Sequence, residues 1–122
     1  YDEAIRINQD YAAAYNNRGN ANNDLAQPER ALRDYDQAIR LNPKDADVFI
    51  NRGNTLNELA QFERSVVDYG EAIRLNPNYS EAYHNRGVAY NRLGNYEDSE
   101  RDFAKVAELR EIAENGQSSV AP

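Results

Sequence analysis

Three segments of this chain repeat one pattern at a constant spacing of 34 residues. Each segment begins with an aromatic residue and ends four positions later in an Asn-Arg-Gly triplet, at 15–19, 49–53 and 83–87. The string Ala-Ile-Arg-Leu-Asn-Pro keeps the same spacing at 38–43 and 72–77, and Ala-Ile-Arg-Ile-Asn stands at 4–8. A period of this length indicates a stacked array in which each unit buries its apolar face on its neighbours. We therefore expect a helical array rather than one central core.

Each unit contains two stretches in which small and apolar residues recur three to four positions apart, as one face of a helix requires. In the first unit these predict helices over about 12–25 and 28–42. Pro28 lies where the first turn of the second helix needs no amide hydrogen, and Asn42-Pro43 and Asn76-Pro77 end helices. The unit is thus predicted to be a helical hairpin.

The pattern resembles the tetratricopeptide repeat family over about residues 1–109. The matching positions are the aromatic residues Tyr15, Phe49 and Tyr83, the glycines Gly19, Gly53 and Gly87, the small residues Ala31, Ser65 and Ser99, the aromatic residues Tyr35, Tyr69 and Phe103, then Ala38, Ala72 and Val106, and finally Pro43 and Pro77. Departures are Arg18, Arg52 and Arg86 for leucine, Asn22 for an apolar residue, Pro28 for an aromatic residue, and Ala26 and Ala60 for glycine. The near-identical Asn-Arg-Gly units resemble bacterial members.

The resemblance implies an all-α fold, a right-handed α-solenoid of stacked helix-turn-helix hairpins. The expected boundaries are 1–11 for the second half of a truncated repeat, 12–45, 46–79 and 80–110 for three repeats, and 111–122 for the end of a capping helix and a tail. The capping helix is expected to stop at Gly116, and 115–122 to be disordered.

The constant spacing also suggests that each repeat glycine makes room for the small residue twelve positions later. Ala26 and Ala60 are expected in left-handed backbone, which costs alanine about 1 kcal/mol.

Every arginine of the triplet is followed sixteen residues later by an aspartate, giving Arg18 with Asp34, Arg52 with Asp68, and Arg86 with Asp102. We predict a structural salt bridge between the two helices of each hairpin. The alternative is that these arginines line a binding groove.

Asparagine recurs in the first helices although it is a mediocre helix former. In this family the first helices line the concave face, where amides can pair with the backbone of an extended peptide. Similar asparagine ladders line the tetratricopeptide superhelix of O-linked N-acetylglucosamine transferase. The predicted peptide-binding residues are Asn16, Asn17, Asn20, Asp24, Asp47, Ile50, Asn51, Asn54, Asn57, Glu58, Glu81, His84, Asn85, Val88, Asn91 and Arg92. Ile50 and Val88 are candidate apolar anchors, and the ladder asparagines could instead bind the backbone of the neighbouring repeat.

Co-chaperone members of the family hold a C-terminal carboxylate with lysines, an arginine and asparagines. The corresponding positions here are Asn16, Asn20, Asn51, Glu81 and Asn85, and Glu81 would repel a carboxylate. We therefore do not expect that class of ligand.

Composition narrows the other possibilities. The net charge of -7 opposes binding to nucleic acid, and no apolar run is long enough to span a bilayer. Cysteine is absent and His84 is the only histidine, so no metal site or cofactor is expected. No catalytic constellation stands out, because acidic runs such as 97–100 fit helix starts.

The sequence therefore predicts a non-enzymatic interaction scaffold that binds an extended, neutral-to-basic peptide in its concave groove. The alternatives are a regulatory or substrate-recruiting segment of a larger enzyme, such as a glycosyltransferase, and a self-assembling structural solenoid. Because the chain begins at Tyr1 in the middle of a repeat, it is expected to be a fragment with an apolar first edge that could self-associate. It indicates no cellular compartment, since a targeting segment would lie upstream.

Overall fold

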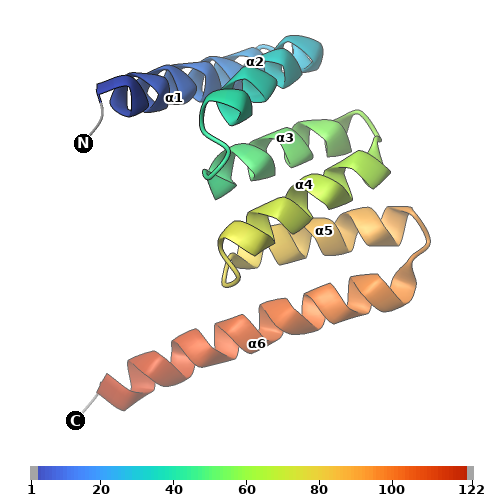
Figure 1. Cartoon of the computed structure of the whole chain (residues 1–122). Coiled ribbons are helices and arrows are strands. Elements are labelled where there is room, and N and C mark those ends of the chain that lie inside the picture. Colours follow the sequence, from blue (N-terminus) through green and yellow to red (C-terminus); the bar gives the residue numbers. More distant parts are fainter. Residues whose placement is uncertain (1–2, 121–122) are drawn as a thin grey trace.

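The computed structural model describes residues 3–120 of the chain, and the side chains of residues 3–116. Among these residues all regular structure is helical. The helices, in chain order, are α1 (Glu3–Asp24), α2 (Pro28–Leu41), α3 (Ala46–Glu58), α4 (Phe62–Leu75), α5 (Ser80–Arg92) and α6 (Tyr96–Val120). They form three antiparallel hairpins, α1/α2, α3/α4 and α5/α6, stacked in order along the molecule (Figure 1). The predicted all-α array of helical hairpins is confirmed.

Local chemistry explains where these helices begin and end. Pro28 opens α2 in its first turn, and the Asp45 side chain caps α3 by accepting a hydrogen bond from the amide of Asp47 at 3.0 Å. After α2 and α4, the side chains of Asn42 and Asn76 accept from the amides of residues 44 and 78, which turns the chain into the next hairpin.

The turns inside the hairpins use left-handed backbone, as predicted. Ala26 has a φ of 58°, Ala60 of 57° and Gly94 of 80°. At each of these turns the next amide reaches back to the helix, as when Gln61 donates to the carbonyl of Leu56 at 2.8 Å. Two of the three turns therefore hold alanine in a conformation that favours glycine.

The core lies between successive hairpins as well as inside them. Tyr35 and Ala38 of α2 pack with Val48 of α3, and Tyr69 and Ala72 of α4 pack with Ala82 of α5. Each first helix from α3 onward is thus covered by the second helix of the preceding hairpin. Burial in this molecule depends on having a neighbour on the correct side.

The repeat glycines lie closest to aromatic rings, whereas the sequence suggested that they lie closest to small residues. A Cβ on Gly19 would lie 2.6 Å from Cε1 of Tyr35, and one on Gly53 would lie 2.8 Å from Cε1 of Tyr69. On Gly87 it would lie 3.0 Å from Cε1 of Phe103. The aromatic ring sixteen positions later therefore sets the need for glycine.

Both ends differ from the expected boundaries. Residues 3–10 do not form a separate second helix, because α1 runs without a break from Glu3 to Asp24. Gln9 stands where Pro43 and Pro77 end the later helices, so nothing at this point removes a helical hydrogen bond. At the other end α6 passes through Gly116 and continues to Val120, beyond the predicted stop. Residues 121–122 lie outside the described residues.

Candidate functional site on the inner face

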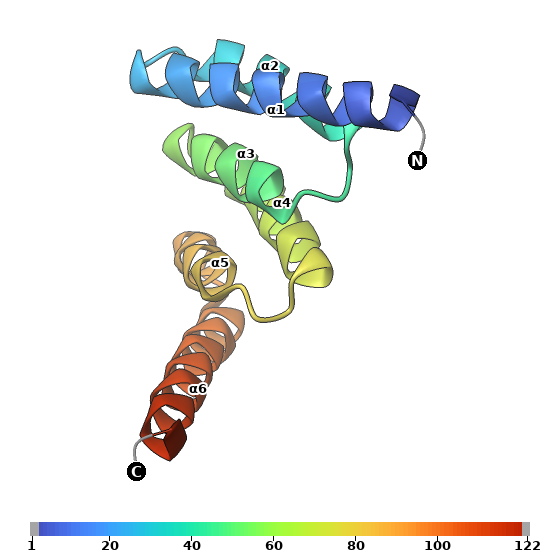
Figure 2. The ribbon, with the colours of Figure 1, turned by 90° about the vertical axis from the view of Figure 1, so that its left-hand side faces the viewer.

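The array bends toward its first helices. Helix α1 contacts α3 and α3 contacts α5, whereas among the described residues the second helices α2, α4 and α6 make no direct contact with one another. Figure 2 shows the accompanying rotation of the stack, from α1 lying across the view to α6 running steeply down it. The surface that α1, α3 and α5 share is therefore the inner, concave face, and it carries the predicted peptide-binding residues.

These residues differ in how much of each side chain the inner face exposes. Exposed are Asn17, Asp24, Asp47, Glu58, Glu81, His84, Val88, Asn91 and Arg92, and half-buried are Asn16, Asn20, Asn51, Asn54, Asn57 and Asn85. Ile50 is buried, with 2 % exposure. The half-buried set consists entirely of asparagines, and their hydrogen bonds explain why.

A chain of side-chain hydrogen bonds crosses the middle hairpin from α4 to the inner face. The Ser65 hydroxyl donates to Oδ1 of Asn57 at 2.6 Å, Nδ2 of Asn57 donates to the Tyr69 hydroxyl at 3.1 Å, and that hydroxyl donates to Oδ1 of Asn54 at 2.6 Å. Because each group accepts from one side and donates to the other, the chain fixes the orientation of Asn54. Its oxygen points into the protein, and its amide nitrogen is left for the groove.

The first hairpin contains only part of this chain. The Tyr35 hydroxyl donates to Oδ1 of Asn20 at 2.6 Å, as Tyr69 does to Asn54. Ala31 stands where the middle hairpin has Ser65, and Oδ1 of Asn23, the counterpart of Asn57, is buried without a hydrogen-bond partner among the described residues. Among the described residues, the first hairpin thus has one buried acceptor without a hydrogen bond. In the middle hairpin the hydroxyl of Ser65 satisfies the equivalent acceptor.

In the third hairpin the hydroxyl and its acceptor are both missing. Phe103 replaces the tyrosine, and Val88 replaces the asparagine fifteen positions before it. Ser99 instead donates to the carbonyl of Gly87 at 2.7 Å. Tyrosine and asparagine therefore occur together in two hairpins and are lost together in the other. Sequence reasoning missed the tyrosines as positioning residues, although this paired replacement was visible.

The asparagine ladder joins neighbouring hairpins through side chains. Asn51 donates through Nδ2 to Oδ1 of Asn16 at 3.1 Å, and Asn85 donates to Oδ1 of Asn54 at 2.9 Å. The second bond lands one turn further along because Ile50, at the position of Asn16, offers no acceptor. The partners are side chains and not the neighbouring backbone that the sequence suggested as an alternative.

Two predicted binding residues are taken up by the structure itself. Ile50 packs with Phe49, Tyr69, Ala72 and Ala82 in the core and cannot anchor a ligand, because α5 covers it. Asn57 uses both side-chain atoms inside its own hairpin. Val88, with 37 % exposure, is left as the apolar residue of the inner face.

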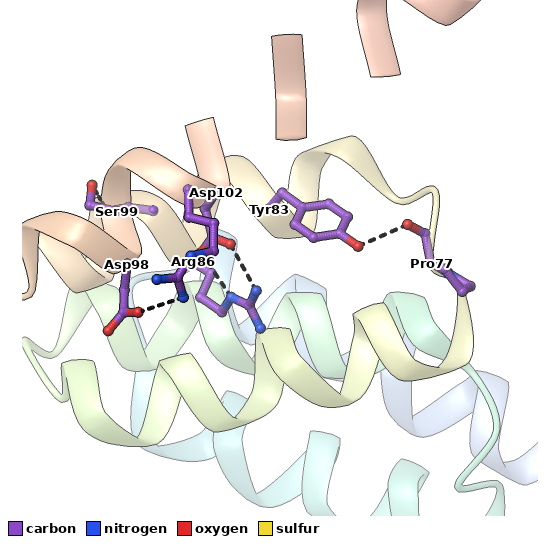
Figure 3. A network of polar contacts seen from close by, with 8 residues as sticks. Pro77, Tyr83, Arg86, Asp98, Ser99 and Asp102 are labelled. Atoms are coloured by element: carbon purple, nitrogen blue, oxygen red, sulfur yellow. Dashed lines mark hydrogen bonds and ion pairs between the residues drawn. The ribbon is translucent and has the colours of Figure 1, made fainter. Parts of the chain in front are cut away.

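Each arginine of the repeat triplet pairs with the aspartate sixteen positions later. The Nη2 to Oδ1 distance is 2.7 Å for Arg18–Asp34, 2.7 Å for Arg52–Asp68 and 2.8 Å for Arg86–Asp102. Nε of each guanidinium donates to the same carboxylate, and its carbon lies over the ring of Tyr15, Phe49 or Tyr83. Figure 3 shows the third pair beside Tyr83, whose hydroxyl donates to the carbonyl of Pro77. These pairs join the helices of a hairpin and point away from the groove.

A hollow of about 200 Å³ opens on the inner face between the first two hairpins, lined by Asn20, Asn23, Asp24, Tyr35, Asn51 and Asn54. The pKa of the Tyr35 phenol is raised to about 12, mainly by burial and in smaller part by the nearby carboxylates of Asp24 and Glu58. The hollow is therefore walled by amides and a neutral hydroxyl, with negative charge at its rim.

Other kinds of site find no support among residues 3–120. No group of three or more His, Asp or Glu side chains in this range is placed to hold a metal ion. No helix within the described chain combines the length and apolar character needed to cross a membrane.

Family models match most of the chain. Models described as tetratricopeptide repeat match residues 12–45, 34–66 and 80–115, and one described as TPR repeat matches 53–94. No curated protein matches.

Solved structures with the same architecture include the second TPR of Spaghetti (RPAP3) bound to the HSP90 peptide SRMEEVD. It is 30 % identical with a TM-score of 0.85, over 88 % of this chain and 99 % of that one. The Arabidopsis OM64 TPR domain is 28 % identical with a TM-score of 0.81, covering 84 % of each chain. MamA is 26 % identical with a TM-score of 0.83, over 85 % of this chain and 61 % of that one. Such domains typically bind other proteins and are not typical of enzymes.

Proposed function

Because the chain belongs to the tetratricopeptide repeat family, we propose that it is a protein-interaction module that binds an extended peptide segment along its inner face. The observation that carries this proposal is the row of oriented amides. The oxygens of Asn20 and Asn54 accept from buried tyrosine hydroxyls, and their Nδ2 groups, which have no acceptor among the described residues, can donate to peptide carbonyls. Donors fixed in place before binding lose little conformational entropy when a ligand arrives.

We further propose that the peptide is neutral to basic. The predicted inner-face residues include the carboxylates of Asp24, Asp47, Glu58 and Glu81 but only one arginine, Arg92. Asp24 lines the hollow between the first two hairpins, and the charge of Glu58 acts on Tyr35 in its wall, which suits the end of a lysine or arginine side chain. Val88 offers an apolar contact further along the same face.

An acidic peptide such as SRMEEVD, bound by the RPAP3 domain, is not the ligand we propose. The positions that resemble the carboxylate clamp hold Asn16, Asn20, Asn51, Glu81 and Asn85, without a lysine or arginine. Asn51 already donates to Asn16, and the Glu81 side chain is exposed where a cation would be needed. Coulomb repulsion at Glu81 disfavours a carboxylate ligand.

The test is a selection of random short peptides on the immobilised chain, followed by fluorescence anisotropy with the selected peptides and with labelled SRMEEVD. Selected peptides are expected to contain lysine or arginine, and SRMEEVD to bind much more weakly. The double variant Asp24→Asn, Glu58→Gln should weaken the selected peptides roughly fivefold. Its matched control, Glu29→Gln with Glu63→Gln, changes exposed carboxylates on second helices and should leave affinity unchanged. Acidic selected peptides, or equal binding by both double variants, would contradict the proposal.

A further inference from the structure

His84 stands on the inner face beside the asparagine ladder. It is the only histidine of the chain, its side chain is exposed, and it lies on α5 next to Asn85. Its ring meets the ring of Phe103 edge-on, with the two centroids 5.6 Å apart and the planes at 60°. Nδ1 of the histidine lies 3.2 Å from Oδ1 of Asn85. Two neighbours therefore hold the ring in place, and the contact with Asn85 decides what each ring nitrogen can do.

Hydrogen bonds from inside the protein determine which atom of Asn85 faces the histidine. The Tyr69 hydroxyl donates to Oδ1 of Asn54 at 2.6 Å, and the same oxygen accepts from Nδ2 of Asn85 at 2.9 Å. Asn85 therefore turns its amide nitrogen toward α3 and its oxygen toward His84. Because an amide oxygen only accepts hydrogen bonds, Nδ1 of His84 has to carry the ring proton.

The proton on Nδ1 leaves the other ring nitrogen as an acceptor. A neutral imidazole holds one proton, so Nε2 of His84 has a free lone pair. Nε2 makes no hydrogen bond within the described residues, and the side chain is exposed on the inner face. The nearby Nδ2 group of Asn54 is a donor. His84 thus places an acceptor on the same face as the donor of Asn54.

No following hairpin covers this histidine in the part of the chain that the structure describes. Ile50 holds the corresponding position of α3, and α5 buries it. Helices α2 and α4 end at Leu41 and Leu75, whereas α6 continues past their counterpart Leu109 (Figure 1). The His84 ring is therefore open to a ligand within residues 3–120.

We propose, on the basis of the function proposed above, that Nε2 of neutral His84 accepts a hydrogen bond from a backbone N–H of the bound peptide. Asn85 is the positioning residue that keeps the proton on Nδ1. An extended peptide presents both N–H and C=O groups along one edge, so the donor of Asn54 and the acceptor of His84 together match that edge. Protonation of the ring replaces the acceptor by a second donor and adds a positive charge, which disfavours a neutral-to-basic peptide.

The ionisable groups on the elements around His84 are mainly carboxylates. Glu81 lies one turn before it on α5, Asp47 stands at the start of α3, and Glu100 belongs to the turn of α6 before the ring that His84 touches. Tyr69 of α4, which packs with α5, is a fully buried phenol and stays neutral. Carboxylates are ordinarily ionised above about pH 5, so the histidine is the member of this set that changes charge between about pH 5.5 and 8.

The first test reads the position of the ring proton in the free chain. Long-range proton–nitrogen correlation NMR distinguishes the two tautomers, and the single histidine makes the assignment unambiguous. At about pH 8 the Nδ1–H form should predominate, and Asn85→Ala should shift the ring to the Nε2–H form that an isolated imidazole side chain favours. Predominance of Nε2–H in the parent chain would mean that the amides run in the opposite order, and would overturn the inference.

The second test uses fluorescence anisotropy with histidine-free peptides selected as described above. His84→Phe keeps a ring against Phe103 but has no ring nitrogen, and should weaken binding roughly fivefold at about pH 8. His84→Gln, which offers an amide oxygen, should retain the affinity. Lowering the pH to about 5.5 should weaken binding to the parent chain and leave both variants unchanged. Circular dichroism checks that the variants keep their helices.

Methylation of one peptide nitrogen at a time locates the N–H that the histidine binds. One position should weaken binding to the parent chain roughly fivefold and have no effect on binding to His84→Phe. Equal binding by the parent chain and His84→Phe at both pH values would overturn this inference and leave the proposed function standing. A selection that yields no peptide would contradict the proposed function and this inference together.

Discussion

The middle hairpin has neighbours on both sides, and each end hairpin has only one. At the first end this exposes the first helix, where the side chain of Arg18 is 65 % exposed against 22 % for Arg52. At the other end it exposes the second helix, where Phe103 is 37 % exposed while Tyr69 is fully buried. Equivalent positions of the repeat therefore have different surroundings. In this array a residue's contribution to stability is set by its neighbouring hairpin as much as by its own.

The largest expected effect tests this for the ion pairs. Arg52→Ala should lower the free energy of unfolding by about 3 kcal/mol, because it leaves the carboxylate of Asp68, 5 % exposed, without its partner. Arg18→Ala should have a clearly smaller effect, since the equally buried carboxylate of Asp34 keeps a hydrogen bond from Nδ2 of Asn22 at 2.8 Å and the Arg18 guanidinium is largely exposed to water. Urea unfolding followed by circular dichroism measures both. Equal effects would show that neighbours do not set the strength of these pairs.

The repeat glycines give a second contrast. Gly53→Ala would push its methyl group against the ring of Tyr69, which is fully buried and cannot move aside, and should destabilise the protein by about 2 kcal/mol. Gly87→Ala meets the more exposed ring of Phe103, which has room to shift. There the better helix propensity of alanine, about 1 kcal/mol, should offset much of the clash. Thermal unfolding of the two variants distinguishes the rings.

The tyrosines of the first two hairpins should make stability depend on alkaline pH. Burial raises the pKa of Tyr35 to about 12 and that of Tyr69 still further above its ordinary value of 10.0. A raised pKa in the folded state stabilises the protein fully below the unfolded value, and this stabilisation is lost as pH rises through the folded value. At pH 11 we expect a loss of about 1 kcal/mol per buried tyrosine.

Tyr69→Phe, which imitates Phe103, should flatten the alkaline limb of the stability curve. Denaturant unfolding between pH 9 and 11 provides the measurement. An unchanged slope in Tyr69→Phe would mean that other groups cause the loss.

The unsatisfied amide of the first hairpin predicts a gain. Ala31→Ser should supply a hydroxyl to the buried Oδ1 of Asn23, as Ser65 does for Asn57, and raise stability by about 1 kcal/mol. The reverse change, Ser65→Ala, should leave Oδ1 of Asn57 unsatisfied and cost a similar amount. Opposite signs for the two changes, measured by urea unfolding, would establish that the hydroxyl matters in both hairpins.

The period of the sequence was enough to predict the hairpins, since it reports contacts inside one unit. It also gave the correct partners for Arg18, Arg52 and Arg86, because each pair lies within a hairpin. The burial of Ile50 and the side-chain bonds of Asn51 and Asn85 depend on how one hairpin rests on the next. The period of the sequence does not predict these contacts, because they depend on the geometry with which the hairpins stack.

The repeat pattern also did not predict the structure at the two ends of the chain. Helix α1 continues through Gln9, because this position lacks the proline that ends the later helices. The rings of Tyr35 and Tyr69 match the aromatic position of the family pattern, which predicts packing alone, whereas the role of their hydroxyls depends on the hydrogen bonds to Asn20 and Asn54.

The smallest expected effect concerns the turns. Ala60 is held at a φ of 57°, where Gly94 of the third hairpin is held at 80°. Ala60→Gly should relieve about 1 kcal/mol of backbone strain, and the greater freedom of glycine in the unfolded chain should cancel part of it, leaving a gain of roughly 0.5 kcal/mol. Gly94→Ala should cost a similar amount, because nothing lies within 4 Å of its Cβ position and strain alone decides. Matched thermal unfolding of both variants measures the pair, and a loss on Ala60→Gly would show that the unfolded chain dominates.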